Sequence, residues 1–366
     1  MMKTFRFNEI AYNSTQKVKP TEADKEHYIG LEHIDGECLY ISRWGSDVAP
    51  IGEKLVMRKG DILFGKRRAY QRKVAIAPID GIFSAHGLVL RPKEDVVDKD
   101  YFPFFMSSNQ FLDRAVQISV GGLSPTINWK DLARQEFTLP SLSEQKVLAD
   151  KLWAAYRVKE SYKKLLAATD DMLKAKFMEM FGEEEKITLE SIASAWSKGQ
   201  SFSKNDIVDE GSTPCIHYGQ LYKYGYVINN VFSATNASAK TTSIKGDILF
   251  PASDVTPKGL ARCSCIDLDD VILGGDIIVM HPVEGINPTY LSYAINQQTN
   301  QLLQLVTGSV VRHMSAKSLK TVKVPLPPLP LQQQFVEIAT QAEATKESLR
   351  KSIENIDQVI KSLINQ

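Results

Sequence analysis

The sequence contains one pattern twice, and the second copy begins a little under 190 residues after the first. The pentapeptide Gly60-Asp61-Ile62-Leu63-Phe64 recurs letter for letter as Gly246-Asp247-Ile248-Leu249-Phe250. Further matches follow at an offset one residue larger: Gly121 with Gly308, Lys130 with Lys317, Leu132 with Leu319, and Leu139-Pro140 with Leu326-Pro327. Each copy is too long for a solenoid repeat, so the chain is predicted to hold one domain plus an appendage, twice.

The overall composition is that of a globular protein without a membrane segment. Hydrophobic residues make up 43% and charged residues 24% of the chain, and no apolar run is long enough to span a bilayer. Residues 1–9 lack the apolar core of a secretory signal, so a cytoplasmic location is expected. The net charge of +1 excludes a protein that binds nucleic acid through a high overall positive charge. Any contact with a duplex must therefore come from local basic patches.

The chain shows no signature of a metal or nucleotide site. Cys38, Cys215, Cys263 and Cys265 form no paired Cys-x-x-Cys set, so they are predicted to be small buried thiols and no metal is expected. No glycine-rich phosphate-binding loop is present either. No cofactor is therefore expected in this chain.

Candidate catalytic groups are also weak. Asn287-Pro288-Thr289-Tyr290 resembles the Asn-Pro-Pro-Tyr signature of adenine methyltransferases but lacks the second proline. Its counterpart in the first copy lies near Lys99-Asp100-Tyr101-Phe102, so this position is predicted to start a helix in both copies. His33 and His86 have no accompanying nucleophile or metal set and are interpreted as structural. No catalytic residue is predicted.

Each copy ends in a long segment of helical composition. Residues 143–182 contain no proline, and no glycine before Gly182, and they are rich in Ala, Leu, Lys, Glu and Met. This composition predicts one helix of roughly 38 residues, about 57 Å long. Its twin is predicted at 331–366, after the proline-rich stretch 325–330 that gives a stiff approach to the helix.

The two predicted helices share one heptad frame, which indicates that they pack on each other as an antiparallel coiled coil. The a and d positions of the first helix are Leu148, Leu152, Ala155, Tyr162, Leu166, Thr169 and Leu173. Those of the second helix are Phe335, Ala339, Ala342, Leu349, Ile353, Ile356 and Ile360. Lys159 and its equivalent Lys346 interrupt both seams at the same register. The alternative is that each seam packs on its own globular domain.

The globular parts, 1–142 and 183–330, are predicted to be mixed α/β domains. Runs of β-branched residues such as 73–77, 87–90 and 276–280 indicate strands, and a helix is expected after them in each copy, at Tyr101–Val116 and Pro288–Val306. The predicted fold class is therefore α+β, with two repeated domains separated by two long antiparallel helices in a pseudo-twofold arrangement.

The order of domain, long helix, domain, long helix carries a family resemblance. With Gly-Asp-Ile-Leu-Phe in each domain and Leu-Pro-x-Leu before a glutamine-containing helix start (Gln145 and Gln332), the chain resembles the specificity subunit of type I restriction-modification systems. The resemblance implies two target recognition domains, 1–142 and 183–330. The helices 143–182 and 331–366 would then serve as a spacer and as a docking surface. No helix precedes the first domain. The second helix is therefore expected to lie antiparallel on the first, which would close the two domains and two helices into a pseudo-twofold ring.

The resemblance also implies partners. The expected partners are double-stranded DNA with a bipartite target, methyltransferase subunits, of which two are expected, and restriction/translocase subunits. S-adenosylmethionine, ATP and Mg would be bound by those subunits. No membrane partner is expected.

The two copies agree at scaffold-like positions and differ where polar residues gather. Residues 66–73 hold five cations and an aromatic side chain with no acid, whereas their counterpart 252–259 holds one cation and one acid. Residues 124–128 stand opposite the unrelated 311–315. One frame with two different surfaces is what recognition of two unrelated half-sites requires.

Arg pairs with guanine and Asn or Gln with adenine, while Lys, Ser and Thr often hold phosphates. The candidate DNA-binding residues are Lys66, Arg67, Arg68, Tyr70, Arg72, Ser124, Thr126 and Asn128 in the first domain, and Gln220, Lys258, Arg312, His313 and Lys317 in the second. Two alternatives stay open. One is a coiled-coil adaptor whose domains bind other proteins without DNA readout. The other is a recognition module of a differently organised modification system without an ATP-driven nuclease.

Overall fold

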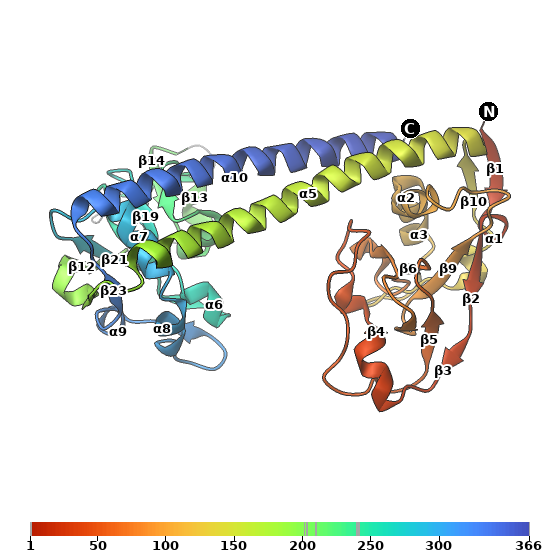
Figure 1. Ribbon diagram of the computed structural model, residues 1–366, viewed down its shortest axis with the longest axis horizontal. Coiled ribbons are helices and arrows are strands. Elements are labelled where there is room, and N and C mark those ends of the chain that lie inside the picture. Colours follow the sequence, from red (N-terminus) through yellow and green to blue (C-terminus); the bar gives the residue numbers. More distant parts are fainter. Residues whose placement is uncertain (1, 201, 203, 209–210, 239–241, 366) are drawn as a thin grey trace. The chain divides into compact units, whose positions relative to one another are not determined.

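The computed structural model describes residues 2–200, 202, 204–208, 211–238 and 242–365, and it divides into two compact units (Figure 1). Unit 1 comprises Met1–Leu165 and Leu349–Gln366, and unit 2 comprises Leu166–Ser348. Each unit holds one mixed α/β domain together with a part of both long helices, so the predicted α+β fold class is confirmed. The α-helices are α1 (Phe7–Ile10), α2 (Phe102–Ser107), α3 (Asn109–Gln117), α4 (Trp129–Leu132), α5 (Leu142–Phe181), α6 (Pro257–Leu260), α7 (Pro288–Asn296), α8 (Thr299–Gln304), α9 (Ala316–Leu319) and α10 (Leu329–Ile364).

Unit 1 is built on small, mostly antiparallel sheets. One sheet has the order β2 (Ala11–Ser14), β9 (Leu88–Pro92), β6 (Ile62–Phe64), β7 (Val74–Ile76). Another has the order β3 (Lys17–Val18), β5 (Lys54–Met57), β8 (Gly81–Phe83), β4 (Tyr28–Ile29), with β4 and β8 parallel. A third pairs β1 (Lys3–Arg6) with β10 (Glu136–Leu139), the strand that leads into α5.

Unit 2 repeats this plan. Its larger sheet has the order β12 (Ala193–Lys198), β21 (Ile277–Pro282), β17 (Ile248–Pro251), β19 (Ser264–Ile266), β15 (Val227–Ile228). A second sheet has the order β13 (Ile207–Val208), β16 (Ala234–Thr235), β14 (Thr213–Ile216), β20 (Ile272–Leu273). Two further pairs join β11 (Lys186–Thr188) to β23 (Lys323–Pro325) and β18 (Ser253–Asp254) to β22 (Arg312–His313).

The repeated pentapeptide has a structural role in both units. Its Ile-Leu-Phe residues form β6 and β17, the sheet strands that pair with β9 and β21. Its aspartate accepts the backbone N–H three residues upstream, Arg58 for Asp61 at 2.8 Å and Ile244 for Asp247 at 2.8 Å. In unit 1 the same carboxylate also joins the neighbouring strand, because Asp61 binds Arg91 through two hydrogen bonds. The motif therefore fixes a turn and a strand pairing.

The glutamine at each long-helix start is also structural. Gln145 is buried, and its amide accepts from the Asp98 backbone N–H and donates to the Pro140 and Val96 carbonyls. Gln332 repeats this role, because its amide accepts from the Asn287 N–H at 2.9 Å and donates to a preceding proline carbonyl. Each glutamine therefore ties the first turn of its helix to the domain before it.

The long helices differ slightly from their predicted ranges. Helix α5 starts at Leu142, because Ser141 and Glu144 form reciprocal capping hydrogen bonds that fix the first turn. Helix α10 starts at Leu329 instead of 331, and Pro330 lies in its first turn. A proline is tolerated there because the backbone N–H groups of the first turn have no partner within the helix. The predicted single helices at Tyr101–Val116 and Pro288–Val306 are wrong. The first is split into α2 and α3, because Ser108 is extended and caps α3, and the second into α7 and α8.

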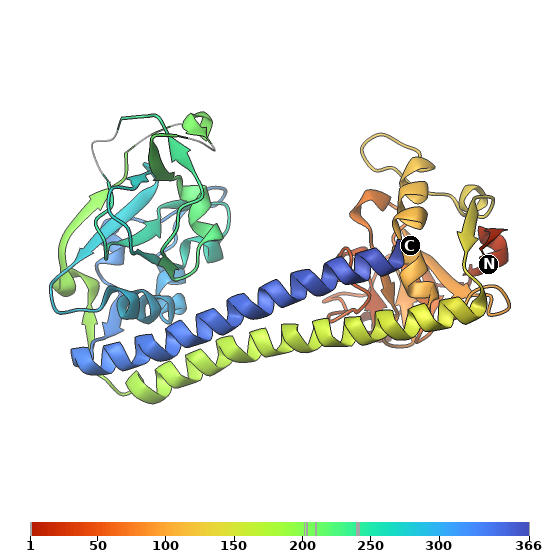
Figure 2. The same ribbon diagram turned by 90° about the horizontal axis from the view of Figure 1, so that it is seen from above.

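In unit 1 the N-terminal part of α5 and the C-terminal part of α10 pack on each other and on the domain core. Leu152 and Ile360 are buried in this core, and Leu148, Ala155 and Ile356 are partly buried against it. Tyr162 and Ile353 are half-buried, and Leu349 is buried. Within this unit the two helices run antiparallel (Figure 2). The first part of α5 lies beside the last part of α10, and Lys159 of α5 pairs with Asp357 of α10.

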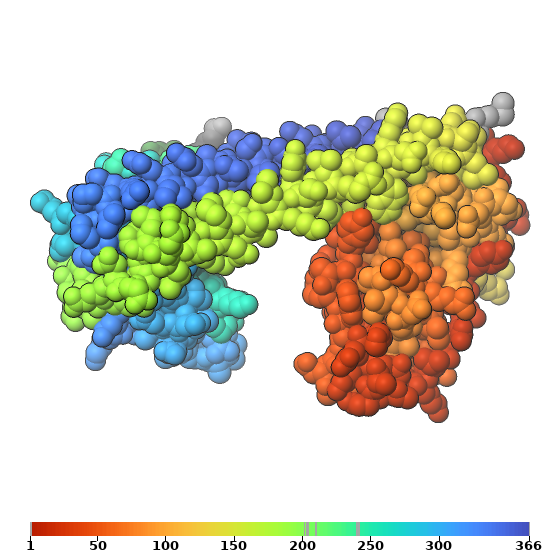
Figure 3. Space-filling view, in the orientation of Figure 1, coloured from red at the N-terminus to blue at the C-terminus, as the bar shows by residue number. Residues whose placement is uncertain are grey.

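In unit 2 the remaining parts of the two helices meet in the same way. Leu173, Phe335, Ala339 and Ala342 belong to its core, and Leu166 is half-buried. The surfaces of α5 and α10 meet without a gap in the space-filling view of this unit (Figure 3). Each helix part therefore packs both on the other helix and on a globular domain, so the two arrangements expected from the sequence as alternatives occur together.

The two lysines that interrupt the seams are buried and paired across the helices. Lys159 on α5 forms an ion pair with Asp357 on α10 in unit 1. Lys346 on α10 pairs with Asp170 on α5 at 2.6 Å in unit 2, and also with Glu343 on its own helix. Burial lowers the pKa of Lys346, but its hydrogen bonds to Asp170 and Glu343 outweigh burial and raise the pKa overall. The two buried lysines occupy equivalent positions of the repeat.

No helix in the part of the chain that the structure describes is long and apolar enough to cross a membrane.

Candidate nucleic-acid interface

In unit 1 the structure brings together the two divergent segments compared in the sequence, 66–73 and 124–128. The Ile127 N–H donates to the Lys66 carbonyl at 2.9 Å, and the Arg68 N–H donates to the Pro125 carbonyl at 2.7 Å. Between these bonds Arg67 and Thr126 form an isolated antiparallel bridge. The cationic segment 66–73 and the loop 121–125 that follows α3 therefore form one continuous surface.

Two guanidinium groups converge on this loop. Arg67 donates to the Ser124 hydroxyl at 3.4 Å, and Arg68 donates to it at 3.2 Å. Arg68 holds a left-handed backbone conformation with φ 57°, which is uncommon for a residue with a side chain and tends to occur at functional sites. Tyr70 is 54% exposed beside them. Neither segment contains an acidic residue, so the arginines offer their remaining donors to an anionic partner.

The positive patch extends beyond the residues that the sequence indicated. The Arg67 N–H donates to the His86 carbonyl at 3.2 Å. Burial, followed by the charges of Arg67, Lys66 and Lys54, lowers the pKa of His86. Burial, followed by the charge of Lys17, likewise lowers the pKa of Lys66. His86, Lys54 and Lys17 lie on other strands or turns, so nothing in the local sequence pointed to them.

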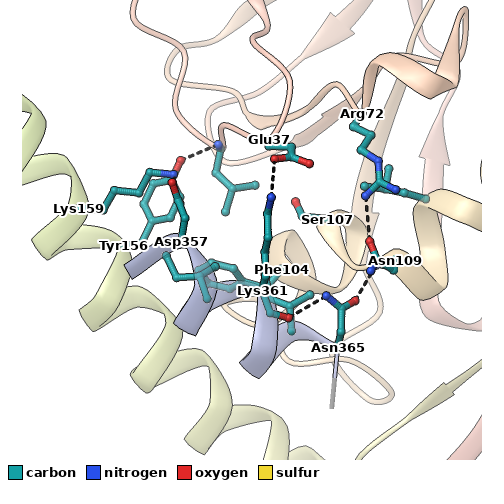
Figure 4. Close-up of a pocket in the computed structure, with 14 residues that line it drawn as sticks. Glu37, Arg72, Phe104, Ser107, Asn109, Tyr156, Lys159, Asp357, Lys361 and Asn365 are labelled. Atoms are coloured by element: carbon teal, nitrogen blue, oxygen red, sulfur yellow. Dashed lines mark hydrogen bonds and ion pairs between the residues drawn. The ribbon is translucent and has the colours of Figure 1, made fainter. Parts of the chain in front are cut away.

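Arg72 lies apart from this patch. Its guanidinium donates to Asn109 at 2.9 Å and forms an ion pair with Asp113 at 3.0 Å, both on α3. It lines a 350 Å³ cavity of unit 1 between the domain and the end of α10, where Glu37 pairs with Lys361 at 3.1 Å (Figure 4). Arg72 therefore helps to hold α10 on the domain, since the Asn109 N–H also donates to the Asn365 side chain (Figure 4).

The remaining unit 1 candidates support the loop. The Thr126 hydroxyl donates to the Ser124 carbonyl at 3.2 Å, inside the hairpin. Asn128 is exposed and precedes α4, and its amide donates to Asp131 at 3.3 Å. Thr126 therefore lies where the two segments of the patch meet, and Asn128 follows two residues later.

Unit 2 repeats the same frame with different side chains. Ser253 and Asp254 of β18 pair with His313 and Arg312 of β22, at the place of the Arg67 and Thr126 bridge. The Ser253 hydroxyl lies 3.2 Å from His313 Nδ1. Arg312 donates to the Gly308 carbonyl at 2.8 Å. The two divergent segments of the second copy are therefore also neighbours, on a less basic surface.

The other unit 2 candidates are scattered. Lys258 on α6 and Lys317 on α9 are exposed. Both ends of the Gln220 amide are engaged within the chain, because it accepts from the His217 N–H at 2.8 Å and donates to the Ser233 hydroxyl at 2.5 Å. Gln220 therefore holds the turn of Tyr218–Lys223 together.

Two arrangements that resemble catalytic sites are explained by the fold. The prediction that Asn287 starts a helix is confirmed, because its side chain caps α7 by accepting from the Tyr290 N–H. His281 lies 2.6 Å from Asp247 and 3.0 Å from the Ser197 hydroxyl, which is the order of a Ser-His-Asp triad. Unit 1 places Arg91 where unit 2 has this histidine, and an arginine cannot act as a base. The contact between His281 and Asp247 thus corresponds to the contact between Arg91 and Asp61, and both join neighbouring strands.

The cysteines are free thiols: Cys215, Cys263 and Cys265 are buried as predicted, while Cys38 is only partly buried. Among the described residues no cluster of three His, Cys, Asp or Glu side chains is placed to hold a metal ion.

The lowered pKa of His86 predicts a pH dependence of duplex binding. His86 is neutral near pH 7, and a phosphate on the patch would favour its charged form, so binding would take up a proton. The affinity of this patch for a duplex is expected to rise by up to about tenfold as the pH falls from about 7.5 to 5.5. His86→Gln should remove this rise, and His27→Gln, at the end of the turn Glu22–His27 in the same unit, should keep it. An unchanged pH profile in His86→Gln would exclude His86 from the interface.

The fold and the candidate site define a class: a duplicated α+β protein whose copies share one frame and carry different surfaces on it. The family model for the type I restriction modification DNA specificity domain matches twice, over residues 5–168 and 182–358. The chain belongs to this family of non-catalytic specificity subunits, which confirms the resemblance noted in the sequence.

Individual relatives agree with this assignment. Over 142 residues, 38% of this chain, the sequence is 27% identical to the Type I restriction enzyme EcoDI specificity subunit of Escherichia coli, and the match spans 31% of that relative. The fold is similar to the S subunit of a type I restriction-modification system from M. genitalium, with a TM-score of 0.58 and 14% identity over 100% of this chain and 95% of that one. It is also similar to a chain from a type I R-M system studied for complex assembly, with a TM-score of 0.59 and 17% identity over 99% and 96% of the two chains.

Proposed function

We propose that this chain selects the DNA target of a type I restriction-modification complex, with one half of a bipartite sequence recognised by each unit. The target recognition domains would be 1–142 and 183–330. The observation that carries the proposal is the shared bridge in both units, Arg67 with Thr126 and Ser253 with His313. In each case it joins two segments in which the copies differ. A protein that recognises two unrelated half-sites needs one scaffold with two different surfaces.

The chemistry of the first surface suits a duplex. Arg67 and Arg68 present planar donor groups of the kind that pair with guanine, and Lys66 and Ser124 suit phosphate oxygens. Because the chain carries a net charge of only +1, binding depends on this local patch. An adaptor that bound only proteins would leave the three successive cations Lys66, Arg67 and Arg68 without a role.

The long helices would provide geometry and docking. In this proposal α5 and α10 set the gap between the half-sites and bind two methyltransferase subunits, with restriction/translocase subunits joining the complex. Methyl transfer and base extrusion would take place in those partners, together with S-adenosylmethionine, ATP and Mg. A modification system without an ATP-driven nuclease would use this chain in the same way, and the identity of the co-purifying subunits distinguishes the two.

Shortening both helices by one heptad tests the spacer role. Deleting 161–167 from α5 and 348–354 from α10 removes equivalent residues and keeps both cross-helix ion pairs. One heptad spans about 10 Å of helix, so the gap in the methylated motif is expected to shrink by at most about three base pairs while the half-site letters stay the same. Altered letters with an unaltered gap would contradict the spacer role.

A further inference from the structure

Both units carry the same five-residue hairpin loop beside the proposed DNA surface. In unit 1 Val120 and Thr126 exchange two backbone hydrogen bonds, of 3.1 and 2.9 Å, and enclose residues 121–125. In unit 2 Thr307 and His313 do the same at 3.0 and 2.8 Å and enclose residues 308–312. The two loops therefore have equal length and equal closure, although their sequences differ.

Each loop exposes an apolar side chain near its tip. Leu123 is 97% exposed and Val310 is 80% exposed, and both follow the shared glycine by two residues. Around them the copies share few residues, since Ser124-Pro125 stands opposite Val311-Arg312. An exposed leucine or valine gains free energy only when a partner covers it. Its presence at the same place in both loops points to a shared contact.

Glycines and hydrogen bonds define the backbone conformation of both loops. Gly121 and Gly308 open them with positive φ angles of 116° and 91°, and a Cβ on Gly308 would lie 2.3 Å from the Val311 carbonyl oxygen. The Pro125 carbonyl accepts from Arg68 in unit 1, and the Gly308 carbonyl accepts from the Arg312 side chain in unit 2. A loop ordered before binding loses little conformational entropy when it contacts a partner.

The charges around the tips specify the partner. Arg67 and Arg68 converge on Ser124, the residue after Leu123, and Arg312 lies two residues after Val310. Residues 119–128 and 307–315 contain no acid. The partner must therefore combine negative charge with an apolar group that a narrow loop can reach. The major groove of DNA does so, because phosphates border it and the thymine C5-methyl group lies within it.

We propose that Leu123 and Val310 contact thymine methyl groups, one in each half-site, and so contribute apolar sequence recognition at an A·T pair. The inference rests on the proposed DNA-binding function. A groove contact fits better than insertion between base pairs, since burying one leucine only offsets the cost of unstacking one step. The flanking arginines then hold the loop in the groove.

The test uses the full chain assembled with its methyltransferase partner and a duplex carrying its methylated motif. Thymines of each half-site are replaced singly by deoxyuridine, which lacks the methyl group, and affinity is measured by fluorescence anisotropy. Leu123→Ala is expected to weaken binding about fivefold to twentyfold without changing the salt dependence. At one thymine of the unit 1 half-site, deoxyuridine should weaken wild-type binding and have no further effect on Leu123→Ala. Val310→Ala should show the same pattern in the other half-site.

The matched control is Val48→Ala, an apolar truncation at a 68% exposed loop position of unit 1 outside both hairpins and both long helices. It should leave the deoxyuridine effects unchanged. The inference would be overturned if Leu123→Ala and Val310→Ala bound the duplex with wild-type affinity. It would also be overturned if each deoxyuridine weakened binding by these variants as much as it weakens binding by the wild type. Either result would leave the DNA-binding function intact. A wild-type complex that binds no bipartite duplex would instead contradict the proposed function itself, and the inference with it.

Discussion

Replacing Lys66, Arg67 and Arg68 together by alanine is expected to abolish specific recognition by unit 1, with a loss of about 100-fold or more in duplex affinity at about 0.1 M salt. One bidentate arginine contact to a base contributes about 1–3 kcal/mol, and each lost phosphate contact lowers the salt slope by about one. Because Arg67 and Arg68 also hold Ser124, the loop 121–125 should lose its fixed position as well. Anisotropy measured across a salt series gives both quantities.

The control is a second triple variant that removes the same positive charge from another part of the surface. Lys198, Lys245 and Lys320 of unit 2 are surface cations that each pair with an acid, namely Asp276, Asp267 and Glu190. Their triple alanine variant should bind the duplex within about twofold of wild type, since exposed ion pairs contribute little. Equal losses in both triple variants would mean that binding depends on overall charge and not on the 66–68 patch.

Reversing one charge of the unit 1 ion pair between buried Lys159 and partly exposed Asp357 should reduce stability. Lys159→Asp would place a second acid beside Asp357 in the helix seam, and is expected to destabilise unit 1 by about 1–3 kcal/mol, because Lys159 is buried while Asp357 is 36% exposed and partly screened by solvent. Lys159→Asp combined with Asp357→Lys restores an ion pair with its charges exchanged, so most of the loss should be recovered. Urea unfolding monitored by circular dichroism measures the midpoints, and the coupling between the two changes follows from the cycle.

Two further variants separate charge pairing from simple burial. Asp357→Ala leaves the Lys159 ammonium buried without its carboxylate, whereas Lys159→Met with Asp357→Ala leaves no charge to bury. The single variant should therefore be less stable than the double variant. The equivalent changes at Lys346 and Asp170 should act on unit 2. A double charge exchange that is no more stable than Lys159→Asp alone would show that the pair does not determine the helix register.

The long helices and the scaffold motif could be predicted because their signals are local. Proline and glycine bound the helical segments, and the equivalent positions of Lys159 and Lys346 mark the same register in both apolar stripes. The seam residues Leu152 and Phe335 are buried because a continuous apolar stripe has to be covered. The strand order could not be predicted, since pairings such as β6 with β9 join residues far apart in the sequence.

The segments of the candidate site could be predicted only where their signal is local in the sequence. The run 66–68 is visible as cations without acids, and its partner loop is visible because the copies diverge there. Arg72 belongs to the same run, yet its partners Asn109 and Asp113 lie on α3, and no local pattern could reveal them. His86 was missed as a part of the patch because a single histidine carries no signal until the Arg67 contact places it there.

The central claim is that one chain supplies two half-site specificities, and the most direct measurement is methylation sequencing of host DNA. The chain is co-expressed with its methyltransferase partner, and methyladenine is mapped with and without it. The account predicts a bipartite motif with a fixed gap that disappears when this chain is omitted, and loss of sequence selectivity in one half alone when Lys66, Arg67 and Arg68 are replaced. Methylation without the chain, or a single continuous motif, would contradict the account.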